Sequence, residues 1–552
     1  MMDLVVFENN KPYVLDEFRE GRFDYIELAS DVAETRFFQY LFRNEVVNRL
    51  ARDYPTPRER EGVPLWMYVS SELSMRLHGS ASHHSYPLLI RSGGLLNALG
   101  PDQARREVDP ATGDLSIRCA GLSRRNLYPR QTPCDQDTLR KLAKDTDAEA
   151  LQQWYNTKAA QVYADLGAYD AAGIFVGDGT YLFVPDNPQY EGSERLLFDE
   201  HNHPVSRERE AKMTQAQRAR CRWRRCYKAV LLLHTDWSGE RFVVAGLRVL
   251  GAKEPEGKAL WELVETFVAA VGPGVLKVLV ADRGFIDGPQ IGHLKRDLGI
   301  DVVLPVRSDM AILEDALGLA KLGLPSEDYR PTPRAPLESA RGEHPVARER
   351  EKARHRTLTR RRTQARKDNP PDPHDVLERT PLTRIPDLTS WADCPVPLTG
   401  VLSRELYADG HEHAWLLVTT APEATARHVR DLYRLRTDIE ERHRQVKCFW
   451  DLTRFRSTAW ATVVSQTVFV ALTYSLLQVH LLHQGHQALN RRTWPTTRRL
   501  LPDADRVLVY RQQYFAFLTL LEHTELVLNL EEPARRKALA KVRRLQRDDL
   551  TN

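Results

Sequence analysis

The order of strands and helices between residues 173 and 306 limits this chain to few folds. Three β-rich apolar runs come first, and a basic, helix-leaning insertion at residues 207–225 separates the first from the second. Predicted strands fall at residues 173–184, 227–234, 242–250, 275–280 and 301–306, and predicted helices at 259–271 and 291–298. Strands joined by short connections pair antiparallel, whereas strands joined by a helix pair parallel. We therefore expect an antiparallel half followed by parallel crossover units.

This order is that of a ribonuclease H-like α/β fold, with a mixed five-stranded sheet and flanking helices. In that fold the first and fourth strands are neighbours. Asp178 lies inside the first apolar run between two glycines, and Asp282 directly follows the fourth. Carboxyl ends of parallel strands are where α/β sheets place ligands, so we expect the two side chains to converge. Each also has an ordinary interpretation: Asp178 as a turn residue beside glycine, and Asp282 as a helix cap.

A charged helical face lies further along the chain. Tyr433, Arg436, Glu440 and Lys447 are separated by three, four and seven residues. At 3.6 residues per turn, all four project from one side of a helix. Taken alone, this stretch is more typical of a surface helix held by salt bridges. Together with the two aspartates, its carboxylate indicates a site for a metal ion and a phosphate.

Three carboxylates held close together repel one another unless cations lie between them. Oxygen-rich sites with open positions favour Mg²⁺ or Mn²⁺. Two such ions activate a water or a 3′-hydroxyl and stabilise the leaving oxygen in an in-line displacement at phosphorus. We therefore predict that Asp178, Asp282 and Glu440 are catalytic and bind two Mg²⁺ ions, with Mn²⁺ as a substitute.

The chain resembles the DDE transposases of bacterial insertion sequences, in particular the IS-four family. The resemblance covers roughly residues 170 to 485. The signature is Tyr433-x2-Arg436-x3-Glu440-x6-Lys447, and the two aspartate contexts are Gly-Asp-Gly-Thr at Asp178 and Ala-Asp-Arg-Gly-Phe at Asp282. The resemblance implies a DNA endonuclease and strand transferase that moves a mobile element by cut-and-paste.

The resemblance also implies roles for the remaining signature residues. Tyr433, Arg436 and Lys447 would contact DNA phosphates near the cleaved end, since an arginine fork binds phosphate in two places. In relatives that cut through a hairpin, a flipped base stacks on a tryptophan placed like Trp415. A tryptophan that packs the core of a β module is the alternative. The implied partners are double-stranded DNA, as terminal inverted repeats and target, and a second protomer in a homodimer.

The rest of the chain divides by composition. We expect a mostly helical DNA-end-binding region at residues 1–135, a first catalytic part at 136–307 that opens with one helix over 136–169, an insertion at 308–425, a second catalytic part at 426–485, and a helical, dimerising region at 486–552. Within the insertion, the segment 340–373 is predicted to be disordered and residues 396–420 to form a β module. Residues 340–367 hold eleven Arg or Lys and three Glu, which is typical of a solvated linker or of a polycation that grips a phosphate backbone.

Composition excludes several other classes of protein. The net charge is only +4, and no C-x-x-C pair is present, so neither a zinc ribbon nor a disulfide framework is supported. The apolar run 459–482 carries many polar groups, which favours a buried helix over a membrane span. We therefore expect a soluble, intracellular protein, and the resemblance to bacterial transposases implies that it is cytoplasmic and associates with the nucleoid when it acts.

Two other functions share part of this pattern. One is a metal-dependent nuclease of the same fold that cuts DNA without joining it. The other is a domesticated DNA-binding protein without catalysis, although a binding surface has no need of three mutually repelling acids. Strand-transfer products from a 3′-hydroxyl donor would separate the first from a transposase.

Overall fold

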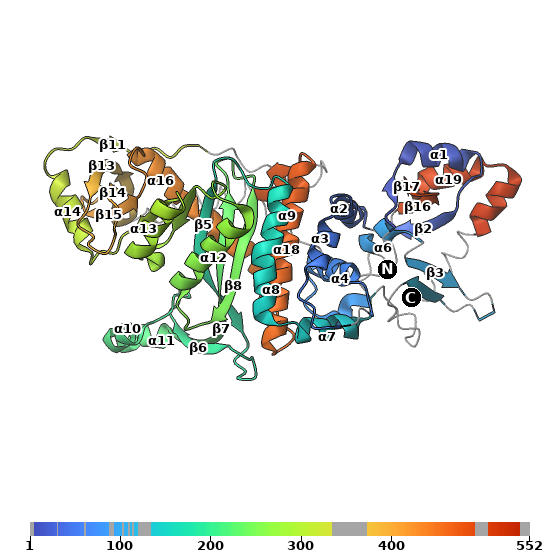
Figure 1. Ribbon diagram of the computed structural model, residues 1–552, viewed down its shortest axis with the longest axis horizontal. Helices are drawn as coiled ribbons and strands as arrows, with labels where there is room; N and C mark the ends of the chain where they lie inside the picture. The colour runs from blue at the N-terminus through green and yellow to red at the C-terminus, as the bar shows by residue number, and fades with distance from the viewer. Residues whose placement is uncertain are drawn as a thin grey trace.

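One large mixed sheet dominates the computed structural model (Figure 1), which describes residues 5–29, 31–59, 62–87, 93–101, 104–108, 111–112, 115–119, 134–333, 373–491 and 506–540. Its central strands are β5 (Ile174–Val184), β7 (Arg222–Thr235), β8 (Phe242–Gly251), β9 (Val278–Ala281) and β10 (Asp301–Pro305). They lie in the order β8-β7-β5-β9-β10. The pairs β8–β7 and β7–β5 are antiparallel, and β5–β9 and β9–β10 are parallel. This mixed sheet agrees with the predicted strand order and is consistent with a ribonuclease H-like fold.

Helices cover both faces of this sheet. On one face, α12 (Glu256–Val271) packs so closely that a Cβ at Gly177 would lie 2.5 Å from Leu260 Cδ2, which explains the glycine beside Asp178. Because successive side chains of a strand alternate between faces, Asp178 points to the other face, where α17 (Arg436–Cys448) lies. Two further helices flank the parallel end, α13 (Gly288–Asp297) and α14 (Ala311–Ala320).

The predicted β insertion continues the same sheet. Its strands are β11 (Ser326–Asp328), β12 (Leu377–Arg379), β13 (Pro381–Leu388), β14 (Leu398–Tyr407) and β15 (Glu412–Thr419). The last of these pairs antiparallel with β10, so that Leu304 lies opposite Val418. The insertion is therefore joined to the catalytic sheet by backbone hydrogen bonds. The basic segment at 340–367 lies outside the described residues.

Residues 136–169 do not form the single helix that the sequence predicts. They are divided into α7 (Gln136–Asp145), α8 (Ala148–Trp154), a π-helical turn (Tyr155–Ala159) and α9 (Ala160–Asp165). The break occurs because Thr146 is extended and the Asp147 side chain accepts a hydrogen bond from Ala150 N, which starts a new helix.

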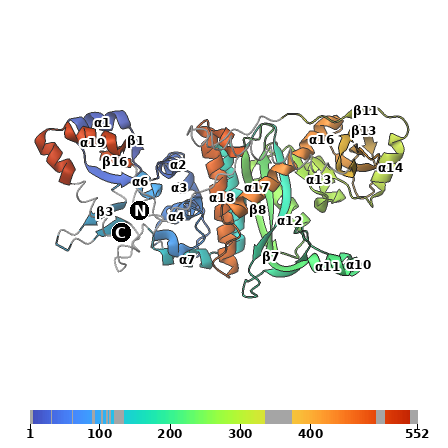
Figure 2. The ribbon, with the colours of Figure 1, turned by 180° about the vertical axis from the view of Figure 1, so that it is seen from behind.

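The two ends of the chain come together in one domain-like unit. It lies on the right in Figure 1 and on the left in Figure 2. Strands β1 (Glu8–Asn9), β2 (Tyr25–Ala29), β16 (Arg506–Arg511) and β17 (Tyr514–Thr519) pair in the order β1-β17-β16-β2. Two helices, α1 (Lys11–Arg19) and α19 (Leu520–Leu528), pack on them. The C-terminal region, predicted to be helical, thus contains two strands in addition to a helix. The hairpin turn holds Gln512 at φ +53°, without the glycine or asparagine that marks such turns in a sequence.

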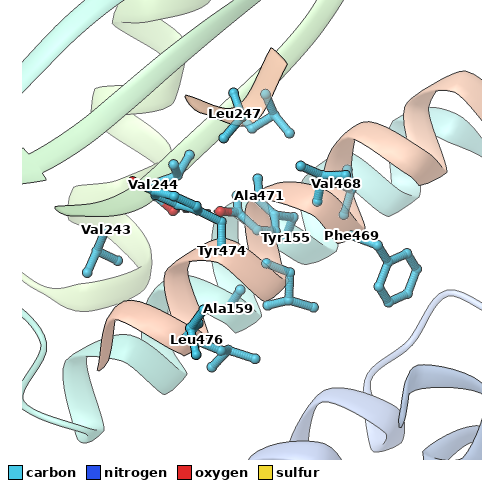
Figure 3. Close-up of a cluster of buried hydrophobic side chains, with 14 of the residues drawn as sticks. Tyr155, Ala159, Val243, Val244, Leu247, Val468, Phe469, Ala471, Tyr474 and Leu476 are labelled. Atoms are coloured by element: carbon cyan, nitrogen blue, oxygen red, sulfur yellow. Dashed lines mark hydrogen bonds between the residues drawn. The ribbon is translucent and has the colours of Figure 1, made fainter. Parts of the chain in front are cut away.

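A helical layer separates this unit from the large sheet. It contains α2 (Val32–Arg43), α3 (Val46–Arg52), α4 (Leu65–Leu77) and α6 (Gly94–Leu99), while β3 (Ala104–Val108) and β4 (Leu115–Cys119) form a separate hairpin. The central element is α18 (Trp460–His483). It is long and apolar enough to cross a membrane, but 83% of its most apolar stretch is buried inside the protein, as the sequence predicted. Figure 3 shows its side chains between the π-helical turn and β8.

Helical side chains complete the hydrogen bonds of β8, which lies at the edge of the sheet and, among the strands that the structure describes, pairs with β7 alone. Asn156, which is 5% exposed, donates to Leu247 O at 3.0 Å and accepts from Leu247 N at 2.8 Å. Further bonds of this kind run from Tyr155 Oη to Val244 O, from Val244 N to Ser475 Oγ and from Val249 N to Gln152 Oε1. An edge strand with unpaired backbone groups is prone to aggregation, and these side chains remove that hazard while fixing α8 and α18 on the sheet.

Replacing Asn156 should therefore destabilise the protein strongly. Asn156→Leu keeps the side-chain volume but leaves the N–H and C=O of Leu247 buried without partners, so we expect the free energy of unfolding to fall by about 2–4 kcal/mol. Urea unfolding followed by circular dichroism measures this change. Gln153→Leu, at the exposed neighbouring glutamine, is the control and should change little. Equal unfolding midpoints for the two variants would contradict the assigned role.

Candidate active site

The two predicted aspartates meet because their strands are parallel neighbours. Gly177 of β5 pairs with Ala281 of β9, so that Asp178 and Asp282 come next on adjacent strands. Asp178 accepts a hydrogen bond from Gly179 N at 2.9 Å. Asp282 accepts one from Arg283 N at 2.7 Å and caps a short 3₁₀ turn. Asp282 is thus a helix cap, as one of the two interpretations predicted, and it also lies beside Asp178.

Glu440 reaches the same place from α17, and Arg436 lies between it and Asp178. Arg436 Nη1 is 3.9 Å from Asp178 Oδ2, and Nη2 is 2.6 Å from Glu440 Oε1. The Asp178 side chain is 15% exposed and that of Glu440 is 50% exposed. The oxygens of the three carboxylates do not all lie within 4.8 Å of one another in the described structure. The Arg436 guanidinium therefore lies between the carboxylates of Asp178 and Glu440.

The surroundings of Asp178 favour its neutral form. Burial raises the pKa of Asp178 to about 7; the Arg436 guanidinium opposes this rise, and the charges of Asp282 and Glu440 add to it. An acid with a pKa near neutrality, beside two further acids, is characteristic of a functional site. A bound cation would relieve this repulsion, so the donor set suits a divalent ion.

The charged face is not one continuous helix, contrary to the prediction. α16 (Ala426–Arg434) carries Tyr433, and the chain turns at Leu435 before α17 begins at Arg436. The Arg436 guanidinium carbon still lies 5.9 Å from the centre of the Tyr433 ring. The interruption therefore leaves the phenol and the guanidinium together.

Lys447 lies on α17 above strand β5. Its Nζ donates a hydrogen bond to Thr180 Oγ1, two residues beyond Asp178. Burial lowers the pKa of Lys447 to about 8, although the Asp178 carboxyl raises it. The structure thus places Asp178, Asp282, Glu440, Arg436, Tyr433 and Lys447 at one site.

His443 also belongs to this site, although the sequence analysis did not select it. Its Nδ1 lies 3.8 Å from Asp178 Oδ2, and its side chain is 7% exposed. Burial lowers the pKa of His443 to about 3, with Lys447 and Arg436 adding to the effect, so the ring is neutral at pH 7. Within the described residues, its buried Nε2 has no hydrogen-bond partner. The available signal was spacing, because His443 follows Glu440 by three residues and precedes Lys447 by four.

Trp415 lies on β15 next to the phenol of the signature. Its ring is 5.8 Å from the Tyr433 ring and 4.7 Å from the Arg430 guanidinium carbon. Its Nε1 donates to Glu405 Oε1 at 3.1 Å within the same sheet. Trp415 therefore borders the candidate site while being half-buried against its own strands, and its role with a flipped base stays a prediction.

Two further groups of ligating side chains lie elsewhere in the described structure, namely His374, Asp409 and His411, and Asp31, Glu34 and His78. In the first group both imidazoles bond Asp409 through Nδ1, but their rings are stacked 3.9 Å apart at 21°. A metal must lie in the plane of each imidazole that binds it, so stacked rings cannot share one ion without turning. In the second group, Ser74, Gly94 and His78 already donate hydrogen bonds to Glu34, which makes it a structural network.

Comparison with known proteins gives one match. Residues 190–476, just over half of the chain, match the family described as Transposase DDE domain. The matched range contains Asp282 and Glu440 and begins after Asp178. No curated protein matches the chain.

The buried imidazole of His443 should make the protein acid-sensitive. Because the pKa of His443 is about 3 in the folded protein and near 6.5 in an unfolded chain, the unfolded state binds one more proton below pH 6.5. Stability present above pH 6.5 is therefore lost as the pH falls, by about 2 kcal/mol between pH 6.5 and 5 for this one group. His443→Gln should remove that share of the slope in urea unfolding. His201→Gln, in an exposed loop, is the control, and an equal slope for both variants would contradict the assignment.

Proposed function

The chain belongs to the family of DDE transposases, and on that premise we propose that it binds the ends of a mobile element, cleaves the DNA strands there and joins them to a target by cut-and-paste. The observation that carries this proposal is the convergence of Asp178, Asp282 and Glu440, from two strands and a helix, around Arg436. Those residues are separated by more than 250 positions in the chain.

We propose that Asp178, Asp282 and Glu440 hold two Mg²⁺ ions, or Mn²⁺ in their place. The raised pKa of Asp178 supports this, because a carboxyl group disfavoured as an isolated anion gains most from a nearby cation. Divalent ions in such a site activate a water or 3′-hydroxyl and stabilise the leaving oxygen. Arg436 supplies a counter-charge to Asp178 and Glu440. With cations bound by the carboxylates, its fork would be available to a DNA phosphate.

The cationic side chains beside the carboxylates would position the DNA. Arg436 is suited to bidentate phosphate binding, and Tyr433 supports its guanidinium from the adjacent helix turn. Lys447 is held on Thr180, two residues from Asp178, so a phosphate bound there would lie close to the reacting centre. A phosphate would also favour the charged form of this buried lysine.

Other parts of the proposal follow from the resemblance to IS-four transposases. We propose that the N-terminal region recognises terminal inverted repeats, that two protomers act on two DNA ends in the bacterial cytoplasm, and that Trp415 stacks a flipped base if a hairpin forms. Its position beside Tyr433 supports the last point.

Removing one carboxylate should abolish catalysis without abolishing DNA binding. Asp282→Asn and Glu440→Gln keep the side-chain shapes but remove the charge that holds a cation, so Mg²⁺-dependent cleavage of DNA bordering the gene should fall below detection. Glu441→Gln is the matched control. Glu441 pairs with Arg444 rather than with the Arg436 guanidinium, so this variant should remain active. Gel assays of nicked, cut and strand-transferred products measure each step. Cleavage by either of the first two variants would show the site assignment to be wrong, and cleavage without strand transfer would favour a nuclease.

Lys447→Ala tests the proposed phosphate contact. Loss of one phosphate contact should weaken binding of the end DNA and reduce the slope of log K against log salt by about 0.9. Lys258→Ala, at an exposed lysine of α12 paired with Glu262, is the control and should leave the slope unchanged. Fluorescence anisotropy between 50 and 300 mM NaCl measures both. An unchanged slope for Lys447→Ala would exclude a phosphate contact by this residue.

A further inference from the structure

A basic arm projects from one end of the catalytic sheet. We define the basic arm as β6 (Glu194–Phe198), α10 (Arg207–Lys212), α11 (Gln215–Arg220) and residues 222–226 of β7. β6 pairs with this first part of β7, from Cys226 opposite Glu194 to Arg222 opposite Phe198. Figures 1 and 2 both show α10 and α11 at the tip of this projection, away from the rest of the sheet. Residues 222–225, predicted to be part of a helix-leaning insertion, instead form the first residues of strand β7.

Positive charge is concentrated on the returning half of the arm. Residues 212–225 contain six Arg or Lys and no acidic residue. Acids neutralise part of it through the pairs Arg218–Glu210, Arg220–Glu200 and Arg225–Asp186. Arg224 instead bonds the neutral Asn202 and lies over the Phe183 ring at 3.4 Å. The uncompensated charge therefore lies along the start of β7.

An exposed tryptophan lies among these arginines. Trp223 is 53% exposed, and the Arg195 guanidinium carbon is 5.6 Å from the centre of its ring. Trp223 lines an open cavity of about 450 Å³ together with three arginines and two carboxylates, namely Arg220, Arg222, Arg224, Asp199 and Glu200. A large apolar ring left in solvent between guanidinium groups is suited to a partner that offers both phosphates and flat apolar surfaces.

The arm continues the face on which Asp178 lies. Asp178 pairs with Leu231 across the β5–β7 ladder. Trp223 precedes Leu231 by eight positions, an even number, so alternation places its side chain on the same face, and the side chains of Arg222 and Arg224 start from the opposite face of β7. Eight residues of strand span about 26 Å. Duplex DNA rises about 3.4 Å per base pair, so this length corresponds to about eight base pairs.

We propose that the basic arm is a second DNA-contact surface, which grips the duplex about eight base pairs from the phosphate that lies at Asp178. Trp223 packs against a deoxyribose or base edge from the face of Asp178, and Arg222 and Arg224 contact backbone phosphates from the opposite face of the arm, because a two-stranded ribbon in a DNA groove meets DNA on both of its faces. This inference rests on the proposed function, and it adds a contact that lies outside the signature helix and its carboxylates. Because the arm lies at a fixed distance from Asp178, its contact with the duplex determines which phosphate reaches the carboxylates.

The test compares Trp223→Ala and Arg222→Ala with wild type on a 40-base-pair duplex taken from the DNA bordering the gene. Trp223→Ala should weaken binding by about fivefold or more, because removal of a tryptophan buried in an interface costs about 1 kcal/mol or more. Hydroxyl-radical protection should disappear about eight base pairs from the cleaved phosphate and persist at that phosphate. Arg222→Ala should reduce the salt slope by about 0.9. Trp237→Ala, at an exposed tryptophan near the opposite end of β7, is the control for loss of a surface ring.

The outcomes separate this inference from the proposed function. If wild type binds and cleaves the duplex, but Trp223→Ala has the same affinity and footprint, the arm is not a DNA contact and the proposed function stands. If Trp223→Ala changes the oligomeric state in sedimentation but not the footprint, the surface contacts protein and the inference is overturned. If wild type binds no duplex, both are overturned. Thermal melting confirms that each variant is folded.

Discussion

The parallel register between β5 and β9 is the constraint on which the site depends. Pairing of Gly177 with Ala281 places Asp178 and Asp282 side by side, and a slip by one residue would send Asp178 to the face covered by α12. The glycine at 177 contributes directly, because α12 approaches too closely for any side chain there. The sheet and α12 therefore fix the positions of Asp178 and Asp282 independently of Glu440.

The third carboxylate is held by charge as much as by packing. Arg436 bonds Glu440 on its own helix and faces Asp178 on the sheet. Breaking a partly buried ion pair leaves an uncompensated charge, which is costly, so the guanidinium ties α17 to the strand below. Neutral His443 and the tethered Lys447 complete this contact surface. The groups that hold α17 on the sheet are also those that would meet a cation and a phosphate.

Much of the fold could be predicted because its signals are local. Apolar runs and short connections indicate the strand order. The two aspartates can be located because Asp282 directly follows one apolar strand and Asp178 lies between two glycines of another. The break at Leu435 was not predictable, since the residues around it continue the helical pattern. The hairpin at Gln512 has no turn residue to mark it. The strand at residues 222–225 reads as a solvated charged segment until its pairing with β6 is known, and that pairing is a long-range contact.

The account is tested most directly by locating a bound cation. Crystals of the full chain with end DNA, soaked in Mn²⁺ and measured at the manganese edge, reveal ion positions without reference to activity. The account predicts anomalous peaks ligated by Asp178, Asp282 and Glu440, with Arg436 turned from Glu440 toward a DNA phosphate. Peaks only at other residues, such as His374 and His411, with Arg436 still bonded to Glu440, would contradict it.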